Sequence, residues 1–159
     1  MCARCVPFAL LGLAVAACSG PSAPTQPILV VPTFEARPAA VVAGTLSVVL
    51  VTRNTEPHAI MFDLRRPCGG AVNVYDASEL VWDGWSWLHS PPGECKGIDH
   101  AVVLEPGDSL IAGGVAPVAA ILGESLASRT YSVSASIILG PPARRLELFA
   151  PGLVLLSAN

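Results

Sequence analysis

Hydrophobic and polar residues alternate over short stretches of the chain, and turn-forming residues separate these stretches. In residues 44–54, every second residue from Leu46 to Thr52 falls on one face of an extended chain, with polar residues at the two ends. Residues 131–138 alternate strictly, with every second residue from Tyr131 to Ile137 facing inward and serines on the opposite face. The first pattern predicts a largely buried strand and the second a half-exposed strand.

From residue 60 onward the same alternation predicts a series of short strands. Residues 77–78 would join two of them as a hairpin. In residues 105–108, Pro106 sets the first corner of a turn and Gly107 is free to adopt a positive φ. Residues 112–128 fit a short helix, a loop or another strand, and periodicity does not decide between these. The predicted strands cover residues 60–64, 72–76, 79–82, 100–104, 109–111, 144–149 and 153–156.

These strands place the chain in the all-β class. About seven to nine short strands with turn signals between them favour an Ig-like antiparallel β-sandwich. We expect this sandwich to occupy residues 28–159 as one domain, because this length supports one core and not two comfortable ones.

The start of the chain has a different pattern, because residues 6–17 are apolar without a polar face. As a helix they would be about 18 Å long, too short for a hydrocarbon core of roughly 30 Å. One positive charge before the run, Arg4, and small residues at its end are typical of a secretory signal peptide over residues 1–17.

The end of this segment, Val15-Ala16-Ala17-Cys18, resembles the lipobox of bacterial lipoproteins. The resemblance implies cleavage before Cys18, acyl chains on Cys18 and attachment to the membrane through them. Ser19 follows the cysteine in place of a retention signal, so we expect the outer membrane, facing the periplasm. Residues 18–27 would then be the lipidated cysteine and a Pro/Ser-rich tether.

Charge and cysteine content narrow the range of ligands. The net charge of −3 becomes about −4 when Arg4 leaves with the signal peptide, and the only lysine is Lys96, so we expect no nucleic-acid partner. Cys2 and Cys5 leave with the signal peptide as well. The remaining pair, Cys68 and Cys95, is expected to form a disulfide outside the cytoplasm that stabilises the domain by about 3.5 kcal/mol. A two-thiolate metal site lacks further ligands at suitable spacing, so we expect neither a metal nor a cofactor.

Catalytic motifs are missing from the sequence, and we expect the protein not to be an enzyme. The three histidines have no nucleophile or orienting carboxylate at a suitable spacing, and no Gly-x-Ser-x-Gly elbow is present.

The aromatic run of residues 82–89 is the most distinctive local feature. Read as a strand, it puts Trp85, Trp87 and His89 on one face as a candidate binding strip. Trp82 is expected in the core, whereas Trp85 and Trp87 fit the core and the surface equally well.

Several ordered motifs resemble the BsuPI-type domain, the intracellular proteinase inhibitor family of Ig-like folds. The resemblance covers about residues 44–139. After Ser109 the sequence departs from the pattern, since a tryptophan-bearing strand and a Pro-Gly-x-Tyr turn are absent. Secreted relatives often carry cysteines where this chain has Cys68 and Cys95. The matching motifs are Val51-Thr52-Arg53-Asn54-Thr55, Ile60-Met61-Phe62, Val74-Tyr75-Asp76, Val81-Trp82, Leu104-Glu105-Pro106-Gly107-Asp108-Ser109 and Tyr131-Ser132-Val133.

Together these features predict a lipid-anchored envelope protein that acts as a non-catalytic protein-interaction module. Its partners would be the membrane, through the acyl chains on Cys18, and another envelope protein. Two alternatives stay open: a proteinase inhibitor of the BsuPI type, and a glycan-binding module that uses the Trp85/Trp87 strip.

Overall fold

The computed structural model describes residues 26–66, 70–89, 98–123, 126–140 and 142–157. Within these residues the chain is mostly β-structure, with two short helices, α1 (Gly84–His89) and α2 (Val118–Leu122). The all-β prediction is therefore confirmed. The strands are β1 (Ile28–Leu29), β2 (Glu35–Ala36), β3 (Ala40–Val42), β4 (Thr45–Arg53), β5 (Ile60–Arg66), β6 (Ala71–Asp76), β7 (Glu79–Asp83), β8 (Ile98–Leu104), β9 (Ser109–Pro117), β10 (Arg129–Gly140), β11 (Arg144–Phe149) and β12 (Val154–Leu156).

The smaller sheet is built around β4. β9 pairs antiparallel with β4 along its whole length, from Thr45 opposite Pro117 to Arg53 opposite Ser109. The short strands β2 and β3 pair with the other side of β4. Every second β4 residue from Leu46 to Thr52 is buried, as the alternation predicted. The opposite face of β4 is half-buried.

In the described part of the chain the larger sheet has eight strands, with β10 at its centre. One side of β10 pairs with β6 and then β5, and the other side pairs with β12 and then β11. β7 extends the sheet beyond β6, and β8 extends it beyond β5. The β6–β7 connection is the predicted hairpin, and its turn contains Ala77 at φ 53°. β1 adds a parallel pair to β5.

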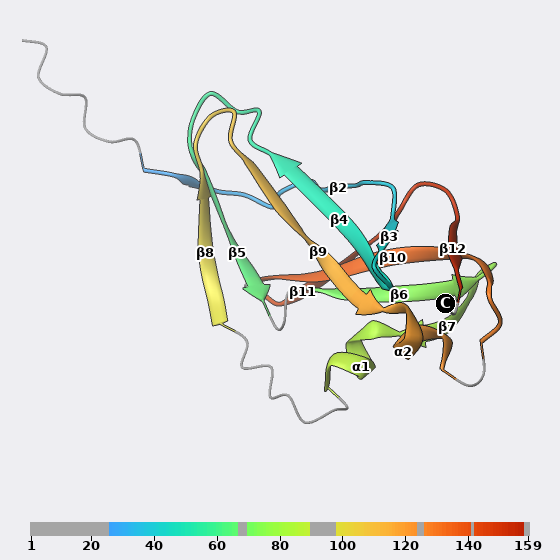
Figure 1. The fold of residues 1–159 in the computed structure, drawn as a ribbon. Helices are drawn as coiled ribbons and strands as arrows, with labels where there is room; N and C mark the ends of the chain where they lie inside the picture. Colours follow the sequence, from blue (N-terminus) through green and yellow to red (C-terminus); the bar gives the residue numbers. More distant parts are fainter. Residues whose placement is uncertain (1–25, 67–69, 90–97, 124–125, 141, 158–159) are drawn as a thin grey trace, which may run out of the picture.

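One hydrophobic core lies between the two sheets. Figure 1 shows β4 and β9 running obliquely across β10 and β6, and these strands are in contact. Leu46, Val48 and Leu50 from the smaller sheet are buried in the same cluster as Phe62 and Val133 from the larger one. Burying aliphatic and aromatic side chains of this size stabilises a fold by roughly 1.5–3 kcal/mol each.

Asn54 holds together the loops at one end of this core. Its side-chain Nδ2 donates to the carbonyl oxygens of His58 (2.8 Å) and Leu104 (2.9 Å), and its Oδ1 accepts from the backbone N–H of Glu56 (2.9 Å). The Asn54 side chain is buried, and its hydrogen bond to Leu104 is buried with it. This position ends the strand motif on which part of the family resemblance depends.

Two predictions about β10 and its preceding segment need correction or completion. β10 is not half-exposed, because Ser134 and Ser136 on its outer face are fully buried. Their neighbours Tyr75, Arg145 and Glu147 lean over that face and hydrogen-bond across it. The segment of residues 112–128 that periodicity left open contains the second half of β9 followed by α2.

The interpretation of residues 82–89 as one strand is wrong. β7 stops at Asp83, and residues 84–89 form α1. The Asp83 carboxylate accepts hydrogen bonds from the backbone N–H of Trp85 (2.9 Å) and from the Ser86 hydroxyl (2.9 Å), which is how an aspartate caps a helix start. Gly84 allows the chain to turn here, because a Cβ would lie 1.8 Å from the Val72 carbonyl oxygen.

Candidate functional site

The free edge of β9 is the feature of this fold with the clearest capacity to bind. Among the described strands, only β4 pairs with β9. Two backbone hydrogen bonds at the ends of this pairing show which β9 residues bond to β4. Val118 N–H donates to the Gly44 carbonyl (2.8 Å), and Asn54 N–H donates to the Asp108 carbonyl (2.9 Å). In an antiparallel pair, hydrogen-bonded positions alternate. Even-numbered residues of β9 therefore bond to β4, and odd-numbered residues direct their N–H and C=O groups to the open edge.

The absence of charge distinguishes β9 from the other edges. Four described strands of five or more residues pair along one side only: β7, β8, β9 and β11. The first, second and fourth of these each carry at least two ionisable residues, whereas residues 109–117 of β9 carry none. Charged side chains on an edge strand oppose pairing with another chain, and an uncharged edge permits it. β9 is thus the edge of this group that is open to strand pairing.

Two side chains on the outer face of this strand are apolar and exposed. Ile111 is 67% exposed and Val115 is 61% exposed. They pair with Val51 and Ser47 of β4, which are half-buried on the same face. The inward face of β9 carries small residues, with Leu110 as the exception.

Glycines bring the middle of β9 against the start of β6. A Cβ on Gly114 would lie 2.8 Å from the Ala71 carbonyl carbon, and a Cβ on Gly70 would lie 2.5 Å from the Gly113 carbonyl oxygen. A Cβ on Gly113 itself would lie 2.1 Å from the Val48 carbonyl oxygen. Only glycine fits at these three positions, so the backbones cross in direct contact. The start of β6 therefore lies directly against β9 at Gly113 and Gly114.

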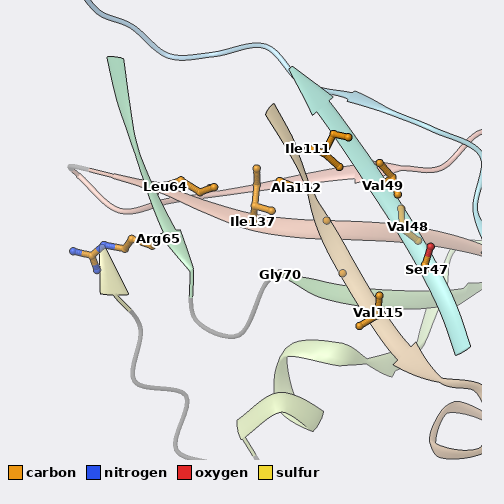
Figure 2. Close-up of a pocket in the computed structure, with 12 residues that line it drawn as sticks. Ser47, Val48, Val49, Leu64, Arg65, Gly70, Ile111, Ala112, Val115 and Ile137 are labelled. Atoms are coloured by element: carbon orange, nitrogen blue, oxygen red, sulfur yellow. The ribbon is translucent and has the colours of Figure 1, made fainter. Parts of the chain in front are cut away.

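A hollow of about 330 Å³ opens around the glycines of β9. Figure 2 shows Leu64 and Ile137 on one side of β9, and Val49 and Ser47 on the other. The volume of the hollow is at the lower end of the range for small-ligand pockets, which is roughly 300–1,000 Å³. The described residues that line it are largely apolar, and Arg65 is the charged one among them. The hollow and the open edge therefore form one continuous site.

A polar network lies on the outer face of the larger sheet. Glu147 Oε1 accepts hydrogen bonds from Asn73 Nδ2 (2.7 Å), Tyr75 Oη (2.7 Å) and Ser134 Oγ (2.5 Å). Burial alone would raise the pKa of Glu147, but these hydrogen bonds and the nearby Arg145 guanidinium outweigh it and lower that pKa. Burial and the Glu147 carboxylate raise the pKa of Tyr75. The network joins β6, β10 and β11, and we assign it a structural role.

The predicted binding strip of Trp85, Trp87 and His89 does not have the expected geometry. In α1, residues two apart point to nearly opposite sides of the helix, so a period of two cannot make a flat strip. Trp85 is half-buried, and the side chains of Trp87 and His89 lie outside the described residues. Trp82 is half-buried and packs against the core, in keeping with its expected place.

The cysteine predictions fall on residues outside the described part of the chain. These are Cys18, with the signal peptide, and the Cys68–Cys95 pair. The register of β5 and β8 does constrain that pair, because Arg66 lies directly opposite Ile98. Cys68 follows Arg66 by two residues and Cys95 precedes Ile98 by three.

Sequence reasoning missed the β9 site although a signal was present. Residues 109–117 lack any charge and contain Gly113-Gly114, but the predicted strand ended at residue 111. A paired glycine in a strand commonly marks close backbone approach, and here it marks the crossing with β6.

No protein-family model matches the chain, and no curated protein matches it significantly. Within the described residues, no helix has both the length and the apolar character required to cross a bilayer.

Proposed function

We propose that this protein is a lipid-anchored envelope protein in which an Ig-like β-sandwich acts as a non-catalytic protein-interaction module. The anchor is Cys18, through the lipobox resemblance of residues 15–18. Two packed sheets in which antiparallel pairs predominate, with a Pro-Gly turn between β8 and β9, support the Ig-like assignment and its resemblance to the BsuPI-type domain.

The proposed Cys68–Cys95 disulfide is supported by the β5–β8 register. Arg66 and Ile98 are direct partners, and residues directly opposite in an antiparallel pair have Cα atoms about 4.5–5.5 Å apart. Each residue beyond them adds at most about 3.6 Å of reach, so two and three residues can bring the cysteines within the roughly 4.4–6.8 Å that a disulfide requires.

The observation that carries the interaction role is the uncharged open edge of β9. Strand addition uses unpaired backbone groups of such an edge to bind an extended segment of a partner. Ser109, Ile111 and Gly113 direct their backbone groups to the edge, and Gly70, just before β6, lies close to the Gly113 carbonyl. The proposed partner is another envelope protein with an exposed extended segment.

Substituting Ile111 tests this role. Ile111→Pro removes one N–H from the open edge and leaves the bonds between β9 and β4 intact, and proline is tolerated at such edge positions. Ile111→Val keeps that N–H and serves as the matched control. We expect a partner isolated with the lipidated wild-type protein to bind the Pro variant at least about tenfold more weakly and the Val variant almost normally.

The melting temperatures of both variants show whether each one folds. Equal binding by wild type and a folded Ile111→Pro variant would refute binding at the β9 edge. Stoichiometric inhibition within a protease panel, unaffected by this substitution, would favour the inhibitor alternative instead.

The anchor has its own measurement. The intact mass of the envelope-bound protein should correspond to a chain starting at an acylated Cys18 and lacking two hydrogens at Cys68 and Cys95. An unprocessed amino terminus or two free thiols would contradict the corresponding part of the proposal.

A further inference from the structure

We infer that the partner segment adds to the smaller sheet as a further strand beside β9 and seats one large apolar side chain in the hollow. This inference rests on the proposed function, and it specifies the register and chemistry of the bound segment.

The alternation of hydrogen-bonded positions along β9 determines which residue of the partner segment enters the hollow. Ala112 bonds to Leu50 of β4, so it occupies a non-hydrogen-bonded position with respect to a new strand on its other side. Residues directly opposite one another in a sheet share a face. Ala112 faces inward and packs against the core. The partner residue opposite Ala112 therefore also points inward, toward Leu64 and Ile137.

The lining of the hollow selects an apolar side chain. Leu64 and Ile137 are 2% and 3% exposed, so the floor of the hollow belongs to the core itself. A side chain placed over them leaves water, and burial of a leucine- or phenylalanine-sized group is favourable. The charged end of Arg65 points away from Leu64 and Ile137 (Figure 2), so a charged side chain over this floor would lose its hydration without a matched partner.

The glycine crossing limits the length of the bound segment. Upstream of Gly113 the edge is open, and from Gly113 onward β6 approaches it closely. The segment can therefore pair with β9 from about Ser109 to Ala112, and it must leave the sheet near Gly113. We expect a short extended segment of about four or five residues.

A second copy of this chain is a poorer occupant than another protein. The inward residues of β9 are small apart from Leu110, and Leu110 already packs against its own core. A paired second β9 would thus leave the hollow without a large side chain. The proposed occupant is an uncharged extended segment of a different protein.

A phage-displayed random peptide library, selected on the folded mature protein, tests this inference. We expect the selected peptides to share one position with a large apolar residue, flanked by residues without charge. Replacing that residue by alanine in a synthetic peptide should weaken binding roughly tenfold or more. Binding should also fall with Ile111→Pro and persist with Ile111→Val.

Replacing either of two alanines of the protein by leucine gives a matched pair of variants that tests the hollow. Ala112→Leu fills it without removing an edge N–H, and Ala119→Leu makes the same change at an exposed position of α2. We expect Ala112→Leu to weaken the selected peptides roughly tenfold and Ala119→Leu to leave them unchanged. The peptide substitutions in the wild-type protein remain decisive if Ala112→Leu does not fold.

The outcomes separate this inference from the proposed function. Suppose that peptide binding is lost with Ile111→Pro but tolerates any side chain at every peptide position. That result would overturn the inference about the hollow and leave the proposed binding at the β9 edge standing. Peptides insensitive to Ile111→Pro, or the absence of any binder, would count against both. A dimer in sedimentation that Ile111→Pro dissociates would replace the foreign segment by a second copy.

Discussion

Removing the Glu147 carboxylate should destabilise the fold more than removing any exposed acid. Glu147 Oε1 accepts hydrogen bonds from three side chains, and two of them, Asn73 and Ser134, are fully buried. In Glu147→Ala the Ser134 hydroxyl loses its carboxylate acceptor and, being fully buried, cannot reach water, at a cost of about 1–3 kcal/mol. Asn73 Nδ2 keeps its bond to Ser136 Oγ (3.1 Å), so it adds less.

We expect a total loss of about 2–4 kcal/mol in the free energy of unfolding. Tyr75 is half-buried and can turn its hydroxyl toward water, so it contributes the smallest share. For a domain of this size, 1 kcal/mol corresponds to roughly 3–4 °C, which predicts a fall in Tm of about 6–16 °C. Chemical denaturation followed by tryptophan fluorescence measures the free energy directly. The control is Glu79→Ala at the exposed start of β7, expected within about 0.5 kcal/mol of wild type.

The pH dependence of stability gives a second readout for the same side chain. The pKa of Glu147 is lowered in the folded protein. Its contribution is therefore present above the unfolded pKa of about 4.3 and is lost as pH falls through the lower folded value. The difference between wild type and Glu147→Gln should shrink on acidification below about pH 4. Equal stability of the Glu147→Ala and Glu79→Ala variants, or a pH-independent Gln difference, would refute this assignment of the network.

Two further substitutions test the fold. Asn54→Ala should lower the free energy of unfolding by about 2–4 kcal/mol in urea denaturation, because three backbone groups lose their buried partner; a change below about 1 kcal/mol would mean that water replaces the side chain. Gly114→Ala should destabilise by about 3 kcal/mol or more, or prevent folding, because the new Cβ meets the β6 backbone at 2.8 Å. Ala116→Gly lies two residues along the same face, and its melting temperature should change less, since it removes one buried methyl group without creating a clash.

Alternation predicted the strands whose one face is buried and whose ends carry turn residues. β4 and β5 are of this kind, and both strands were located correctly from the sequence. β10 was also predicted, but its outer face was wrongly expected to be exposed, because serines on one face of a strand usually indicate that this face contacts solvent. Ser134 and Ser136 are buried by longer side chains from β6 and β11, and that pairing is a tertiary relation.

Local side-chain hydrogen bonds explain the error at the tryptophan run. Residues 82–89 satisfy a period of two, yet Asp83 caps a helix that starts at the next residue. An aspartate at this position followed by glycine is compatible with both a turn and a helix start. Periodicity over so few residues cannot separate them. The prediction of a strand over the tryptophan run thus failed because of local hydrogen bonds. The β9 edge was missed because an edge strand can be identified only when the order of strands in the sheet is known.

The origin of the glycines bears on how the β9 site should be interpreted. Gly114 is required for the contact between β9 and β6, and Gly113 for the close pairing of β9 with β4, so folding alone accounts for both glycines and for part of the hollow. Folding does not account for Ile111, whose side chain is 67% exposed and whose N–H faces the open edge. A lysine or glutamate there would leave the core unchanged and would protect the edge from unwanted pairing. The uncharged residue at position 111, rather than the glycines beside it, therefore distinguishes a binding edge from a structural crossing.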